Sequence, residues 1–153
     1  MKKFYVLLSI LIVGIFFITG CGNKNNSPES NIKKEVTNNV IMNASPQLTT
    51  NLQSILNNNW TIIDTNKIYI TKSKDFENAY FIGTLVKNGS QIYNCIWFSN
   101  NADLNGMTMS ANDFAIQASS MPDGRKSQAA ISETDDGYSR INQKLLTDWE
   151  SLK

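Results

Sequence analysis

The chain has 153 residues, contains no histidine, and carries a formal net charge of +1 at pH 7. Without histidine, Ser-His-Asp hydrolases, Cys-His proteases and histidine-ligated zinc sites are excluded as they are usually built. The near balance of charges gives no electrostatic reason to bind nucleic acid, so we expect no nucleic-acid partner.

The N-terminus has the order of a secretion signal: two lysines, an apolar run from Phe4 to Ile18, and then Thr19-Gly20-Cys21. A membrane-spanning helix needs about twenty consecutive apolar residues. The run here is shorter, and the glycines on either side of Cys21 interrupt it. We therefore predict a cleaved signal over residues 1–20 rather than a transmembrane helix.

The four residues at the end of this signal resemble the lipobox of bacterial lipoproteins. The resemblance implies that a diacylglycerol group is attached to Cys21 and that the signal is cut just before it. It also implies that Ile18, Thr19 and Gly20 are the recognition residues. Two acyl chains bind a bilayer firmly, so we expect a protein anchored at the outer face of the cell membrane, with no other cofactor. The abundance of asparagine and lysine is similar to the bias of an AT-rich Gram-positive genome, and the anchor and tether resemble those of small Gram-positive lipoproteins.

Residues 21–44 are rich in Asn, Ser and Lys and poor in large apolar side chains. Such a segment buries too little apolar surface to offset its ordering entropy, so we predict a lipidated N-terminus and a flexible tether. Val36, Val40 and Ile41 form a short apolar cluster able to dock on the folded domain, which leaves the boundary open. Residues 45–153 are enough for one hydrophobic core, and we predict a single small domain.

The domain begins with a helix signal, because Ser45 suits an N-cap and Pro46 the first helical position. Leu48, Leu52 and Leu56 then repeat at helical spacing. Two short strands are expected at 60–63 and 67–71, separated by a polar turn.

The strongest strand signal is the pair 80–87 and 91–99, joined by Asn88-Gly89, a dipeptide typical of tight hairpin turns. Both arms are apolar on both faces, and such strands need cover on both faces. We therefore place this hairpin at the centre of an antiparallel sheet. Helices are expected over one face and a loop or helix over part of the other.

Two helices are expected after the hairpin. Ser110 or Asn112 suits the cap of a helix that runs to about Met121, and apolar residues repeat at helical spacing from Tyr138 to Leu152. The whole pattern predicts an α+β domain. Its antiparallel sheet has about four strands, with an N-terminal helix and two C-terminal helices packed on it.

Acidic residues suggest a calcium site and a general acid and base pair, but the sequence completes neither. Residues 101–106 begin like a calcium loop, but Asn112 stands where a bidentate Glu is needed, so we favour a polar turn and predict no metal site. Glu133, Asp135 and Asp136 are better explained as a helix cap and partners of the helix dipole than as a general acid and base. The sequence therefore predicts no catalytic residue.

The candidate binding patch consists of Tyr93, Trp97, Arg125 and Lys126. Tyr93 and Trp97 share one strand face, and such residues are enriched at interfaces, although a core also uses them. The two adjacent basic residues are suited to hold a carboxylate or phosphate, although a solvated loop also explains them. Cys95 has no partner once Cys21 is lipidated, and we predict a buried, small apolar residue.

These features favour a non-enzymatic binding or accessory module on the outer membrane face. Its ligand would be a protein, a peptide or a wall component, as in immunity or exclusion lipoproteins of similar size. The alternative is an envelope hydrolase that works with carboxylates. Transporter substrate-binding proteins are longer and two-lobed, so a single small core argues against that role.

Overall fold

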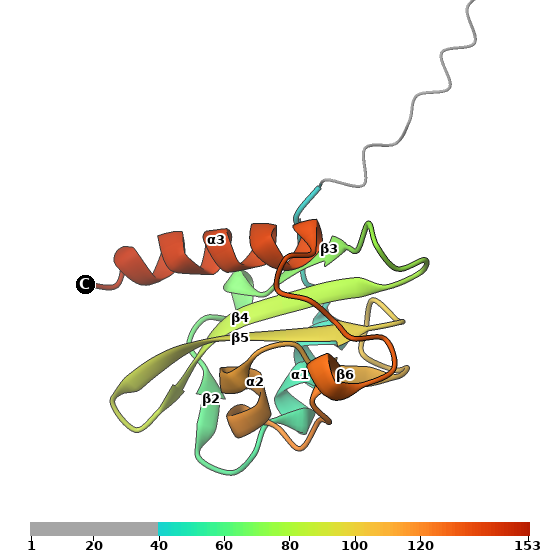
Figure 1. The fold of residues 1–153 in the computed structure, drawn as a ribbon. Helices are drawn as coiled ribbons and strands as arrows, with labels where there is room; N and C mark the ends of the chain where they lie inside the picture. Colours follow the sequence, from blue (N-terminus) through green and yellow to red (C-terminus); the bar gives the residue numbers. More distant parts are fainter. Residues whose placement is uncertain (1–39) are drawn as a thin grey trace, which may run out of the picture. The chain divides into compact units, whose positions relative to one another are not determined.

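The computed structural model describes residues 40–153, which belong to one compact unit. The predicted signal, the lipobox residues 18–21 and the tether up to residue 39 lie outside the described residues. The elements succeed one another along the chain as shown in Figure 1: β1 (Met42–Asn43), α1 (Pro46–Ile55), β2 (Trp60–Ile62), η1 (Thr65–Lys67), β3 (Tyr69–Lys72), β4 (Tyr80–Asn88), β5 (Gln91–Ser99), β6 (Thr108–Ser110), α2 (Asp113–Ala118), η2 (Gly124–Lys126) and α3 (Asp136–Glu150).

The strands form one antiparallel sheet in the order β1-β3-β4-β5-β6, with β2 also paired to β4. β3 pairs with residues 80–83 of β4 and β2 with residues 86–88, so the two short strands share one side of β4. The prediction of a central hairpin is confirmed, since β4 and β5 pair along their whole length. The sheet has six strands instead of about four, because β1 and β6 are too short to show a period in the sequence.

The hairpin turn consists of Gly89 and Ser90, because Asn88 pairs with Gln91. The predicted turn dipeptide is therefore wrong by one residue. Gly89 has a φ of 61°, and glycine at the first loop position with positive φ suits a type II′ turn.

The two faces of the hairpin are covered by different helices, as Figure 1 shows with α3 on one side of the sheet and α1 and α2 on the other. Ile82, Val86, Cys95 and Trp97 pack with residues of α1 and α2. Residues 81, 85, 96 and 98 pack with α3. The predicted α+β class is confirmed, but the helix arrangement differs, since the two C-terminal helices lie on opposite faces.

Side-chain caps set the ends of the helices. Ser45 caps α1 by accepting a hydrogen bond from the Leu48 amide at 3.0 Å, as predicted. Asn112 caps α2. That helix ends at Ala118, earlier than predicted, because the backbone of Ser119 is extended, with φ −139° and ψ 164°. β1 lies within the segment expected to be tether, so the sheet begins before residue 45.

Gly83 on β4 allows α3 to approach the sheet closely. A Cβ atom at this position would overlap Ile141 Cγ2 and would lie 3.1 Å from Leu145 Cδ1. Both side chains are fully buried on α3, so they have no room to move aside.

A buried hydrogen bond joins the C-terminal end of α3 to β3. The hydroxyl of Tyr69 donates to the carboxylate of Asp148 at 2.6 Å, and both residues are buried. Burial by itself raises the pKa of Asp148, but the Tyr69 hydrogen bond and the charges of Lys144 and Lys67 outweigh it and lower the pKa. Burial and the bond to Asp148 raise the pKa of Tyr69, so its hydroxyl remains the donor.

We expect Gly83→Ala to lower the free energy of unfolding by about 1–3 kcal/mol, because the added methyl overpacks the interface with α3. Urea unfolding measures the change. Gly89→Asn is the matched control: nothing lies within 4 Å of its Cβ position, and Asn tolerates positive φ. Equal losses in the two variants would contradict the close approach of α3.

We expect Tyr69→Phe to cost about 1–3 kcal/mol at pH 7, because it removes a partner of a buried carboxylate. The folded-state pKa of Asp148 lies below its ordinary value of about 3.9, so its contribution is present above about pH 4. That contribution is lost as pH falls through the folded-state pKa. The stability gap between Tyr69→Phe and wild type should therefore narrow in urea unfolding at low pH.

The control for this experiment is Tyr80→Phe, which removes the hydroxyl of a half-buried tyrosine on the neighbouring strand. It should leave stability nearly unchanged at both pH values. A gap between Tyr69→Phe and wild type that stays constant with pH would contradict the role given to Asp148.

Candidate functional site

A groove of about 390 Å³ lies beside the outer side of β5, between α2 and α3. We call it the β5-edge groove. Asn94 on β5 lines it, and the rest of the lining comes from α2 with its cap and from α3 with the loop before it. These residues are Asn112, Asp113, Phe114, Gln117, Glu133, Tyr138 and Asn142.

Amide side chains hold the groove in shape. The Asn112 side-chain oxygen accepts from the Ala115 amide at 2.9 Å and from the Ile96 amide at 3.4 Å. Its nitrogen donates to the Asn94 carbonyl at 2.8 Å, so one side chain joins α2 to β5. The Asn94 amide donates to Asn142 at 2.7 Å and so joins β5 to α3.

An aromatic cluster lies next to the groove. The Tyr93 ring is 5.0 Å from that of Trp60 and 5.4 Å from that of Phe114, which also lines the groove. Phe114 is 38% exposed. Tyr93 therefore lies near a partly exposed aromatic surface, but with partners that the sequence analysis did not select. Trp60 and Phe114 occupy periodic positions that a core would also use, so no sequence signal distinguishes them.

Trp97 does not belong to this surface, and its assignment to the binding patch is wrong. It is fully buried, and its indole N–H donates to the Ser119 hydroxyl at 3.0 Å. Both Tyr93 and Trp97 are on the face of β5 that packs with α1 and α2. Trp97 lies on the stretch of β5 that β6 also pairs with, whereas Tyr93 lies nearer the hairpin turn.

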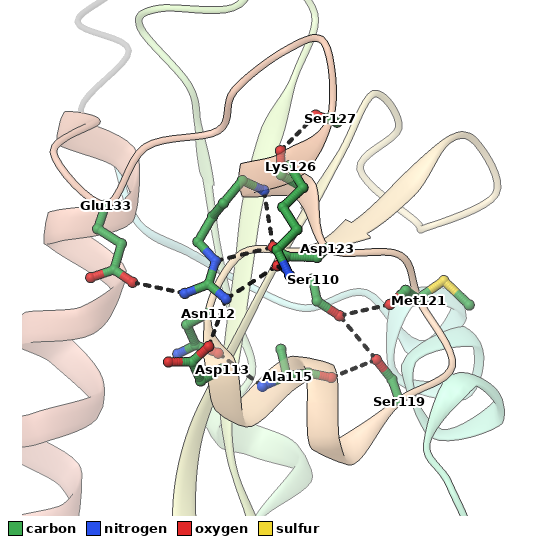
Figure 2. Close-up of polar contacts among 12 residues, drawn as sticks. Ser110, Asn112, Asp113, Ala115, Ser119, Met121, Asp123, Lys126, Ser127 and Glu133 are labelled. Atoms are coloured by element: carbon green, nitrogen blue, oxygen red, sulfur yellow. Dashed lines mark hydrogen bonds and ion pairs between the residues drawn. The ribbon is translucent and has the colours of Figure 1, made fainter.

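Three carboxylates, those of Asp113, Asp123 and Glu133, surround Arg125, and all three acids are labelled in Figure 2. Its guanidinium lies 2.6 Å from Asp113, 3.0 Å from Asp123 and 3.8 Å from Glu133. The hydrogen bonds to Asp123 and Asp113 raise the pKa of Arg125, and the hydrogen bond from Arg125 lowers the pKa of Asp123.

The predicted anion-binding pair of Arg125 and Lys126 is therefore not formed. The guanidinium of Arg125 is already neutralised by acids that come from three places in the chain. Lys126 is largely exposed, and its ammonium group lies 3.5 Å from Asp123. Neither residue lines the β5-edge groove.

Acidic residues before α3 form a cap, as predicted. Asp135 is 1% exposed and accepts from the Gly137 amide at 2.7 Å and from the Ser73 hydroxyl at 2.8 Å. Asp136 is bound by Lys74 and Arg140 at 3.1 and 2.9 Å. The negative charge of Asp135 and a hydrogen bond to it raise the pKa of Asp75, which is exposed.

Residues 101–106 form a polar turn, as predicted, and the structure shows that this turn packs on α1. The Asn101 side chain accepts from the Asp103 amide at 2.8 Å, and Asp103 accepts from the Ser45 hydroxyl at 2.7 Å. Asn51 on α1 donates to the Asp103 carbonyl and to Asn105. The oxygens of the suspected calcium loop are thus used within the domain.

Three further observations concern the described part of the chain. Cys95 is buried, as predicted, and burial raises the pKa of its thiol. Residues 40–153 contain no group of three or more acidic, cysteine or histidine side chains arranged to hold a metal ion. Within the same residues, no helix has the length and apolar character needed to cross a membrane.

Comparison with known proteins adds no assignment. No protein-family description matches the chain, and neither a curated protein nor a solved structure matches it significantly. The β5-edge groove and the predicted N-terminal signal are therefore the two features that bear on function.

Proposed function

We propose that this protein is a membrane-anchored lipoprotein of the cell envelope, and that its domain is a non-enzymatic binding module. The observation that carries this proposal is the β5-edge groove with the aromatic cluster beside it. Ligand sites commonly combine apolar contact surface with a few fixed polar groups, and aromatic side chains are frequent among residues that dominate binding. The groove has both.

The charges around the groove support binding rather than acid and base chemistry. Asp113 and Glu133 line it, but both form ion pairs with Arg125. Both carboxylates are therefore already engaged by a guanidinium within the domain, which leaves no unengaged carboxylate in the lining of the groove.

The alternative of an envelope hydrolase rests on Asp75 and Asp135, two carboxylates close enough for the charge of Asp135 to raise the pKa of Asp75. Asp135, however, is 1% exposed and already accepts from Gly137 and Ser73. A catalytic carboxylate must contact its substrate, so this pair supports the hydrolase less well than the groove supports binding.

The anchor is tested by Cys21→Ser, which removes the acceptor of the lipid. We expect this variant to lose lipid labelling and to be released from the membrane or left uncleaved, because the acyl chains supply the membrane affinity. Cys95→Ala is the matched control and should remain labelled and membrane-bound. A Cys21→Ser protein that stays labelled like wild type would rule out the anchor.

The binding site is tested by Gln117→Trp, which places a large ring at an exposed position that lines the groove. Tagged, lipidated protein is crosslinked on intact cells and recovered together with its bound ligand. We expect one discrete ligand with wild type and at least about a tenfold loss with Gln117→Trp, equivalent to about 1.4 kcal/mol. Gln143→Trp, an exposed residue of α3 that does not line the groove, should retain the ligand. Equal recovery with both variants would remove the groove from the proposal.

A further inference from the structure

The outer side of β5 is only partly paired. β6 pairs with residues 97–99 and then ends. Beyond it, the Ala111 amide donates to the Ile96 carbonyl at 2.8 Å. The side chain of Asn112 then replaces a strand, because it accepts from the Ile96 amide and donates to the Asn94 carbonyl.

Nearer the hairpin turn this edge is open. In an antiparallel pair, each residue directs its N–H and C=O toward the same neighbour, and the direction alternates along the strand. The main-chain groups of Ile96 and Asn94 point away from β4, so those of Ile92 do as well. Within residues 40–153, no strand pairs with the Ile92 N–H and C=O or with the Asn94 N–H on this side. Ile92 and Asn94 are both half-buried rather than covered.

The open edge lies at the β5-edge groove. Asn94 belongs to both, Phe114 and Gln117 line the groove from α2, and Asn142 lines it from α3. A neighbouring strand lies about 4.8 Å away in a sheet, and an unpaired strand edge is a template for such a neighbour. The groove of about 390 Å³ thus lies beside Asn94, on the same side of β5 with which β6 pairs farther along the strand.

The groups that remain unpaired identify the kind of ligand. Asn112 uses both of its side-chain polar atoms on the main chain, and Asn94 and Asn142 bond each other. Arg125 is held by carboxylates and does not line the groove, so no basic side chain there selects an anion. The unpaired groups on β5 itself, those of Ile92 and the Asn94 N–H, are main chain, which favours a ligand that offers main-chain groups in return.

A second copy of this chain fits the groove less well than a peptide does, because its own β5 edge carries α2 and α3 beside it. A single extended segment brings no such helices.

We propose that the β5-edge groove binds an extended peptide segment of another protein, which adds as a strand beside β5 in line with β6. The main chain of the peptide bonds Ile92 and Asn94, and its side chains face α2 and α3 in turn. Residues facing α2 meet the ring of Phe114, so apolar or aromatic side chains are preferred there. This inference rests on the proposed binding function and names its ligand class.

The experiment uses the full chain in detergent and a phage-displayed library of random peptides. Selected peptides are resynthesised with single main-chain N-methyl groups, because each methyl removes one donor. We expect methylation to weaken binding about tenfold at every second peptide residue, where the N–H faces β5. Methylation of the other residues, whose N–H groups face away from β5, should have little effect. Amide exchange of Ile92 and Asn94 should slow when peptide binds, because their N–H groups become hydrogen-bonded.

Ile92→Pro tests the edge from the protein side. Proline lacks the N–H and is tolerated on edge strands, so this variant should fold and bind at least about tenfold more weakly. Ile92→Val keeps the N–H and should bind like wild type. If Ile92→Pro does not fold, the N-methyl series and amide exchange still decide.

Two outcomes separate this inference from the proposed function. N-acetylglucosamine oligomers are tested beside the peptides. If the amide exchange of groove residues changes with the oligomers and with no peptide, the strand proposal is overturned and the binding function still stands. A full chain that selects no peptide, binds no oligomer and recovers nothing from cells would overturn both.

Discussion

The double-sided hairpin of β4 and β5 is the constraint on which the rest of the domain depends. Its two arms are apolar above and below, so each face must be covered for the chain to fold. α1 and α2 cover one face and α3 covers the other. Gly83 brings α3 against the strand, and the bond between Tyr69 and Asp148 fixes its far end. The central hairpin therefore explains why a domain of this size has three layers.

The covering elements leave one strand edge incomplete, and Asn112 is at the centre of that arrangement. Its side chain caps α2, partners the Ile96 amide and holds the Asn94 carbonyl. It closes part of the β5 edge that β6 does not reach. The same residue that starts a helix therefore also determines where the unpaired edge begins.

Periodicity in the sequence predicted the elements that are long and the faces that are buried. The hairpin, α1 and the capped start of α3 were all found from alternation, helical spacing and cap residues. β1 and β6 were missed in the strand count because two or three residues carry no period.

The candidate site was less predictable, because alternation identifies a face of a strand but not how deeply each residue is covered. Tyr93 and Trp97 share a face, yet only Trp97 is fully buried. The fate of Arg125 depends on acids far from it in sequence, among them Asp113 and Glu133. No local sequence pattern predicts these ion pairs between residues that are distant in sequence. The groove between α2 and α3 is likewise a product of tertiary packing.

The strand order also has a mechanical consequence. The described chain enters the sheet at β1, where Met42 and Asn43 pair with β3 and where Val40 and Ala44 add one hydrogen bond each. The β5-edge groove lies across β3 and β4 on the other side of the sheet. A pull on the N-terminal side of the domain would load that short pair first and peel it open residue by residue. The strands that carry the groove would bear load only afterwards. Separation of β1 from β3 would therefore relieve tension along the chain before that tension reaches the strands that carry the groove.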